Sequence, residues 1–301
     1  MNNGKVDWHG CFVAVVTPFT RDGDLDEAAF SRNIDQLVNE AADGIVVSGC
    51  TGETWSLTEQ ERLRTFELAV DTVAGSVPVI AGIGSILTQD VIDLGCAAKD
   101  VGAAGAMVLP PYYCLPNDAE VVEHYRRISD GIELPILLYN TPGRTRVDLT
   151  PDLLEQIIQN EYVVAIKESS AEFLRVERLL NKFSDAIQVM TGHSADRAVP
   201  SVLMGAKGWV SSLETQIMGE EAISMYRLAT SGQAQEAIRI QLKAVQLDEE
   251  IRQFGTFPAN MKAAMNLLGR PGGYPRPPLL PLDGEQVAGV RRVLQSMELL
   301  A

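Results

Sequence analysis

Short apolar runs alternate with longer amphipathic stretches from residue 12 to about residue 212. Eight such runs occur, each four to seven residues long and mostly rich in β-branched residues. Runs of this length are typical of strands buried on both faces of a parallel sheet. The predicted strands are Phe12–Thr17, Gly44–Ser48, Val77–Ile83, Gly105–Leu109, Pro135–Tyr139, Val163–Lys167, Ile187–Thr191 and Gly208–Ser211.

The stretches between these runs carry apolar residues at three- and four-residue spacing, which is typical of helices that cover a sheet. Two helix starts are marked: Thr58 with Glu61 forms a capping box, and Thr150 precedes a proline at the first helical position. The clearest predicted helices are Ala28–Glu40, Glu59–Val73, Asp90–Val101 and Ala119–Gly131.

Eight strand–helix units over some 200 residues predict an α/β fold of the (β/α)8 TIM-barrel type. An open doubly wound sheet is the alternative, but it usually has a glycine-rich phosphate turn after its first strand. Here that strand runs into Thr17-Pro18-Phe19, and Gly82-Ile83-Gly84 lacks the third glycine of a nucleotide motif. The barrel is therefore the prediction.

After Glu214 the pattern becomes purely helical, interrupted by a loop rich in proline and glycine at residues 270–278. We predict two domains, a barrel over residues 1–225 with its active site at the carboxyl ends of the strands, and a C-terminal helical domain over residues 226–301. The predicted helices of this part are Glu220–Thr230, Ala234–Phe254, Ala259–Leu268 and Gly284–Leu300.

Composition narrows the possible partners. The 301 residues are 46% hydrophobic, enough to bury a large core, and the net charge is −15. Such a surface repels nucleic acid and anionic membranes, so neither is an expected partner. No apolar stretch approaches the roughly 18 residues of a membrane span. An anionic substrate would need a local positive group.

Cysteine and histidine positions indicate no metal site. The four cysteines, Cys11, Cys50, Cys96 and Cys114, show no CxxC spacing, and residues 1–10 show no signal peptide. We therefore expect a reduced, cytoplasmic protein. The three histidines are far apart and lack metal-binding spacing, so we expect neither a metal nor another cofactor.

Lys167 is the first candidate for chemistry, because it ends the predicted strand at Val163–Lys167. The carboxyl ends of the strands hold the active sites of α/β folds. Burial can lower the pKa of a lysine by roughly 3–5 units at the extreme, and a neutral amine forms Schiff bases with carbonyls. The alternative is a strand-end lysine whose ammonium group reaches solvent.

Other polar groups end neighbouring strands, which favours one shared active site over packing. They lie in Gly49–Glu53, Pro110–Tyr113, Tyr139–Thr145 and Thr191–His193.

At these motifs the chain resembles the dihydrodipicolinate synthase/N-acetylneuraminate lyase family over essentially its whole length. The motifs are GxTGE at Gly49–Glu53, YNxPxRT at Tyr139–Thr145 and IKE at Ile166–Glu168. The resemblance implies a class I lyase in which Lys167 forms an imine with pyruvate or a related 2-oxo acid. The protonated imine then acts as an electron sink for bond breaking at C3.

The resemblance also implies roles for the residues around Lys167. Backbone N–H groups of Cys50 and Thr51 would hold the substrate carboxylate. Tyr139 would be the general acid/base, a role that contributes ~10²–10⁴ in rate. Tyr113 would reach across an interface into a neighbouring active site, which implies a homodimer or homotetramer. Arg144 would bind the carboxylate of the second substrate, as in the synthases.

Three departures from the family pattern bear on the reaction. Cys50 replaces a threonine whose hydroxyl links the two tyrosines, and a thiol is a weaker hydrogen bonder; alternatively it is a small residue that merely fits. His193 follows Gly192 where an acidic residue is common; it could bind a substrate group or be a solvated loop residue. Trp209 replaces a small β-branched residue, and either narrows the pocket or packs against the helices.

These features leave several functions open. The Tyr139–Thr145 motif favours a dihydrodipicolinate synthase, the default label. Cys50, His193 and Trp209 favour a catabolic aldolase, dehydratase or deaminase acting on sugar acids or hydroxyproline-derived imino acids. Either enzyme would take a 2-oxo acid and a second carbonyl or imino-acid substrate. A non-catalytic 2-oxo-acid-binding barrel is the hypothesis from another class. Feedback inhibition by lysine is not expected, because the usual histidine and asparagine donors are missing at the matching positions.

Overall fold

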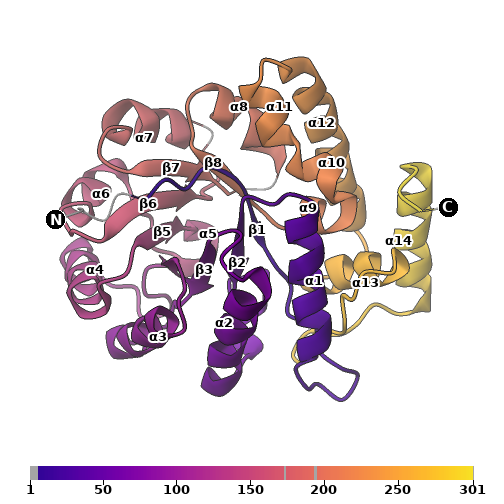
Figure 1. Cartoon of the computed structure of the whole chain (residues 1–301), viewed down its shortest axis with the longest axis horizontal. Helices are drawn as coiled ribbons and strands as arrows, with labels where there is room; N and C mark the ends of the chain where they lie inside the picture. The colour runs from indigo at the N-terminus through magenta and orange to yellow at the C-terminus, as the bar shows by residue number, and fades with distance from the viewer. Residues whose placement is uncertain (1–5, 173, 193–194, 301) are drawn as a thin grey trace.

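Eight parallel strands close into a barrel in chain order, with β8 pairing to β1 (Figure 1). The computed structural model describes residues 6–172, 174–192 and 195–300. The strands are β1 Gly10–Ala14, β2 Gly44–Val47, β3 Val79–Gly82, β4 Gly105–Val108, β5 Ile136–Asn140, β6 Val163–Glu168, β7 Gln188–Thr191 and β8 Gly208–Ser211. All eight overlap the predicted runs, and the predicted (β/α)8 barrel is confirmed.

Helices follow the strands around the outside of the barrel (Figure 1). The capping box of Thr58 and Glu61 is formed at the start of α2, and Thr150 caps α6 ahead of Pro151. The helices up to β8 are α1 Glu27–Asn39, η1 Thr54–Ser56, α2 Glu59–Val73, α3 Thr88–Asp100, α4 Asp118–Ile132, α5 Pro142–Thr145, α6 Pro151–Ile157, α7 Arg175–Phe183, η2 Ala195–Arg197 and α8 Ala198–Leu203.

A helical segment follows β8 and lies along one side of the barrel, with α14 outermost (Figure 1). The helix predicted over Glu220–Thr230 is two helices, separated at Ser224. The boundary at residue 225 stays a prediction; that residue begins α11, which packs against both α8 and α12. The helices are α9 Leu213–Met218, α10 Glu220–Ile223, α11 Met225–Thr230, α12 Ala234–Ile251, α13 Phe257–Leu267 and α14 Gly284–Ser296.

The barrel has two apolar layers, because successive strand residues point to opposite faces. In β8, Val210 belongs to the inner layer with Phe12 and Met190, whereas Trp209 belongs to the outer layer. Trp209 is 1% exposed and lies next to Val202 of α8 and to α11. The prediction that Trp209 narrows the substrate pocket is therefore wrong. The strand alternation sends the indole toward the helices instead.

A buried ion pair joins the helical segment to the loop after β2. Lys262 of α13 is 1% exposed and pairs with Glu53, which is fully buried. The Lys262 ammonium also donates to the carbonyl of Tyr274 at 2.9 Å and lies 4.5 Å from the centroid of the Phe19 ring. Because Glu53 ends the Gly49–Glu53 motif, this pair fixes one wall of the barrel mouth to α13.

Replacing one partner of this pair should destabilise the protein strongly. Lys262→Met leaves the Glu53 carboxylate buried without its cation, so the free energy of unfolding in urea should fall by about 3–5 kcal/mol. The double variant Glu53→Gln/Lys262→Met should recover much of this loss. The matched control Lys207→Met changes an exposed lysine and should stay within about 0.5 kcal/mol of the wild type. A similar small loss for Lys262→Met would contradict the importance of the pair.

Candidate active site

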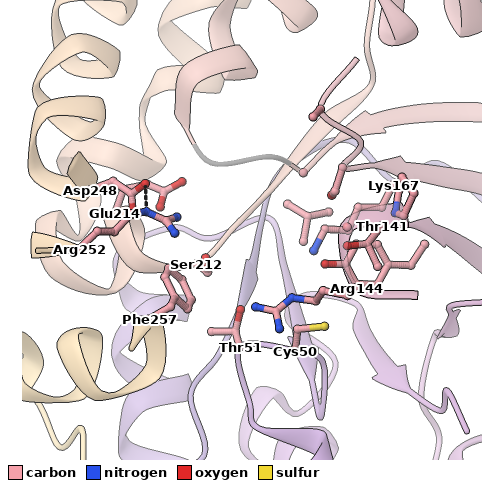
Figure 2. Close-up of a pocket in the computed structure, with 17 residues that line it drawn as sticks. Cys50, Thr51, Thr141, Arg144, Lys167, Ser212, Glu214, Asp248, Arg252 and Phe257 are labelled. Carbon is pink, nitrogen blue, oxygen red and sulfur yellow. Dashed lines mark hydrogen bonds and ion pairs between the residues drawn. The ribbon is translucent and has the colours of Figure 1, made fainter. Parts of the chain in front are cut away.

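A cavity of about 350 Å³ opens at the carboxyl ends of the barrel strands (Figure 2). This volume lies within the range of roughly 300–1,000 Å³ that is usual for small-molecule sites. Its walls come from the ends of β2, β5, β6, β7 and β8 and from the helical segment. The residues that line it are Cys50, Thr51, Tyr139, Thr141, Pro142, Gly143, Arg144, Lys167, Ser169, Ala171, Gly192, Val210, Ser212, Glu214, Asp248, Arg252 and Phe257.

Lys167 lies in this cavity and is only 6% exposed. In β6 it is paired with Tyr139 of β5 on one side and with Met190 of β7 on the other. Burial is the main cause that lowers its pKa to about 8, and it outweighs the opposing effects of Cys50 and Glu214. With this pKa about a tenth of the side chain is a neutral amine at pH 7, far more than for an unperturbed lysine with a pKa of about 10.4, and the neutral amine is the nucleophilic form.

Tyr139 lies directly beside this amine. The Lys167 Nζ atom is 4.3 Å from the centroid of the Tyr139 ring. Burial raises the pKa of Tyr139, and Cys50 acts in the same direction, while Thr141 and Arg144 partly oppose the shift. The phenol therefore stays protonated at neutral pH, which leaves it a proton to donate in the cavity.

Gly192 gives the Lys167 side chain its space. It follows β7, and its amide donates to the carbonyl of Glu168 at 2.9 Å. A Cβ atom at this position would lie 2.4 Å from Cε and 2.6 Å from Cγ of Lys167. Any other residue would displace the lysine. His193, which we predicted to bind substrate, lies outside the described residues.

Buried polar groups behind the cavity hold β5 and β6 in register. The side-chain amide of Asn140 donates to Glu168 at 2.8 Å and to Asp148 at 3.0 Å, and Asp148 pairs with Arg175. Glu168 also accepts from the amide of Ser170 at 2.5 Å. Because Asn140 and Glu168 follow Tyr139 and Lys167 directly, this network sets the positions of both side chains.

The other predicted residues, Cys50, Thr51 and Arg144, also line the cavity. Cys50 and Thr51 line the cavity in the loop after β2, which is tied down by a hydrogen bond from the Thr17 hydroxyl to the carbonyl of Gly52. Figure 2 shows the Arg144 guanidinium directed toward this loop. Within the described residues, no hydrogen bond or ion pair engages the Arg144 side chain, so its N–H groups are available to an anion.

Tyr113 is not brought to the cavity of its own chain. It lies in the loop between β4 and α4, is 89% exposed and has a left-handed φ of 71°. Such a backbone conformation is uncommon for a bulky residue and is often kept for function. Its predicted entry into a neighbouring active site stays a prediction.

Several cavity residues were missing from the sequence-based set. Ser212 directly follows β8 and Glu214 lies in the first turn of α9, so the rule that strand ends carry the chemistry could have found them. Asp248 of α12, Arg252 at its C-terminal cap and Phe257 of α13 had no such signal, because a helical pattern does not show which turn reaches the barrel mouth.

Two further observations concern the described part of the chain. No group of three or more histidine, cysteine, aspartate or glutamate side chains there is arranged to hold a metal ion. Likewise, no helix among these residues has the length and apolar character needed to cross a membrane.

Comparison with known proteins agrees with this geometry. A sequence model described as the dihydrodipicolinate synthetase family matches residues 7–297. The chain belongs to this family. Family members are lyases, so the protein is a lyase, and the resemblance inferred from its motifs is confirmed.

Individual family members cover nearly the whole chain. The 4-hydroxy-tetrahydrodipicolinate synthase of Oceanobacillus iheyensis is 35% identical over 99% of this chain and 98% of its own. An uncharacterized DapA-like lyase of Rhizobium meliloti is also 35% identical, over 98% of each chain. The structure of the family member YagE from E. coli K12, in complex with pyruvate, matches with a TM-score of 0.92 at 27% identity, over 98% of this chain and 100% of YagE.

A methyl group at position 192 should disable Lys167. In Gly192→Ala, the new Cβ overlaps Cε and Cγ of the lysine, so borohydride trapping of pyruvate should slow by at least about tenfold. The matched control is Gly284→Ala, where an added Cβ meets no atom within 4 Å. Trapping by a folded Gly192→Ala variant at the wild-type rate would show that Lys167 does not need this space.

Proposed function

We propose that this protein is a Schiff-base-forming lyase whose first substrate is pyruvate or a related 2-oxo acid, bound as an imine of Lys167. The observation that carries the proposal is the buried Lys167 amine, with its pKa lowered to about 8, beside the protonated Tyr139. The presence of pyruvate in the YagE structure supports this first substrate.

The chemistry follows from the placement of these groups. The Lys167 amine attacks the keto carbon, water leaves, and a protonated imine forms. The imine accepts the electron pair released when a proton or a carbon–carbon bond at C3 is lost, which gives an enamine. Tyr139 is placed to move protons at the imine carbon. The amides of Cys50 and Thr51, in the loop after β2, would supply donors for the carboxylate.

The second substrate separates two forms of this proposal. The relatives named 4-hydroxy-tetrahydrodipicolinate synthase and the available Arg144 cation favour condensation with aspartate semialdehyde, whose carboxylate Arg144 would bind. A catabolic aldolase, dehydratase or deaminase is the alternative, favoured by Cys50, whose thiol would relay protons less well than a hydroxyl.

We further propose that the working enzyme is a homodimer or homotetramer. Tyr113 is exposed in a single chain, and other large apolar side chains in the loops after β2, β3 and β4 are exposed too. Such a cluster is typical of an interaction surface, and a second subunit there would bring Tyr113 toward the neighbouring cavity. These exposed residues are Trp55, Ile86, Leu87 and Leu115.

Borohydride reduction with a panel of 2-oxo acids tests the class and the label separately. Pyruvate should attach covalently to Lys167, as read by peptide mass mapping, and Lys167→Met should abolish the attachment. Lys262, which is also buried but lies outside the cavity, should remain unlabelled in the same digest. If no 2-oxo acid attaches, the proposed class is wrong. Attachment of pyruvate without turnover of aspartate semialdehyde would overturn only the synthase label.

A further inference from the structure

The far wall of the cavity holds a buried carboxyl group with an open acceptor. Glu214 follows β8 at the cavity wall and is 2% exposed. Within the described part of the chain, its Oε1 atom has no hydrogen-bond partner. Burial raises its pKa to about 7 and Asp248 acts in the same direction, while its hydrogen bonds to its own backbone and to Ser211 and the charge of Arg252 partly oppose the shift. An unpaired polar atom buried at a cavity wall is costly unless a ligand satisfies it.

A guanidinium group lies next to this carboxyl group. Arg252, which caps the C-terminus of α12, is held by Asp248, whose Oδ2 atom is 2.7 Å from the Arg252 Nε atom. Its Cζ atom lies 5.2 Å from the centroid of the Phe257 ring. Figure 2 shows Glu214, Asp248 and Arg252 together, on the side of the cavity opposite Lys167. The pair of contacts to Asp248 and Phe257 orients the donors of Arg252.

The chemistry of this wall selects among possible ligand groups. Two carboxyl groups accompany one guanidinium group, so the wall offers an anion no net positive charge. An apolar group would leave Glu214 Oε1 unpaired. A hydroxyl group both donates and accepts, which matches an acceptor on Glu214 beside donors on Arg252.

We propose that Glu214 and Arg252 form a subsite for hydroxyl groups of the second substrate, so that the enzyme acts on hydroxyaldehydes and on the longer hydroxylated 2-oxo acids they form. This inference rests on the proposed imine chemistry of Lys167 and deepens it. Asp248 is a positioning residue, because it acts by holding Arg252. The subsite favours the aldolase form of the proposal, since aspartate semialdehyde carries no hydroxyl group.

The reaction balances without a further reactant. The enamine carbon C3 of Lys167-bound pyruvate attacks the aldehyde carbon, one carbon–carbon bond forms, and the aldehyde oxygen takes up a proton. Water then hydrolyses the imine, which releases a 4-hydroxy-2-oxo acid and returns the lysine amine. Cleavage of such an acid is the same sequence in reverse.

Two aldehydes of equal carbon count test the subsite, with pyruvate as the common partner. Glyceraldehyde carries two hydroxyl groups and propanal carries none. The wild type should prefer glyceraldehyde by about 100-fold in kcat/KM, because propanal leaves the buried Glu214 Oε1 atom unpaired. Glu214→Ala should lower the preference for glyceraldehyde, taken as the ratio of its kcat/KM to that for propanal, by at least about tenfold. Glu214→Gln, which keeps an acceptor of the same shape, should retain part of the preference.

The ratio of kcat/KM for the two aldehydes separates the effect of the subsite from effects on Lys167. Glu214 also raises the pKa of Lys167, but a change in the lysine affects both aldehydes equally. The matched control Arg239→Ala removes an arginine within α12 that pairs with Glu236 outside the cavity, and should change neither value of kcat/KM.

Failure of the subsite and failure of the proposed function give different results. Borohydride trapping of pyruvate on Lys167 should persist in both Glu214 variants. The hydroxyl subsite is wrong if trapping persists but the wild type has the same kcat/KM for both aldehydes. It is also wrong if Glu214→Ala lowers kcat/KM for both aldehydes by the same factor. If the wild type does not trap pyruvate at all, the imine chemistry on which the subsite rests is wrong.

Discussion

The site depends on the burial of one amine at the carboxyl end of β6. Closure of the barrel places Lys167 between β5 and β7, where water no longer stabilises the ammonium form. Desolvation therefore lowers the pKa of Lys167 to about 8, and no neighbouring cation is needed as the main cause. The same burial raises the pKa of Tyr139. One physical effect thus prepares both a nucleophile and a proton donor.

The rest of the structure keeps that amine in place and shapes the space before it. Gly192 leaves room for the lysine chain, and Asn140 with Glu168 fixes the two strands that carry Tyr139 and Lys167. On the far side, the ion pair of Glu53 with Lys262 ties the mouth loop to α13. The helical segment also contributes Asp248, Arg252 and Phe257 to the cavity wall. It can therefore contact the second substrate directly.

The sequence predicted the strands and the residues at their ends, because both follow from the pattern of apolar positions. The eight strands could be predicted because buried parallel strands are short apolar runs, and strand ends placed Lys167, Tyr139, Cys50, Thr51, Arg144 and Gly192 around one cavity, although their roles stay predictions. Trp209 was wrongly predicted to line the substrate pocket, because a fully apolar run does not show which of its residues face the inside of the barrel. Arg252 was missed because its place depends on how α12 packs against the barrel, and Tyr113 depends on a second chain.

The most direct measurement is the titration of Lys167 itself, followed by the NMR shift of its ¹³C-labelled Cε carbon and assigned with Lys167→Met. Because burial lowers the pKa, the side chain should be an ammonium group below pH 8 and an amine above it, with a midpoint near 8. In the urea-unfolded protein the shift of the same carbon should report a lysine pKa of about 10.4. A midpoint in the folded protein that equals the unfolded value would contradict the account.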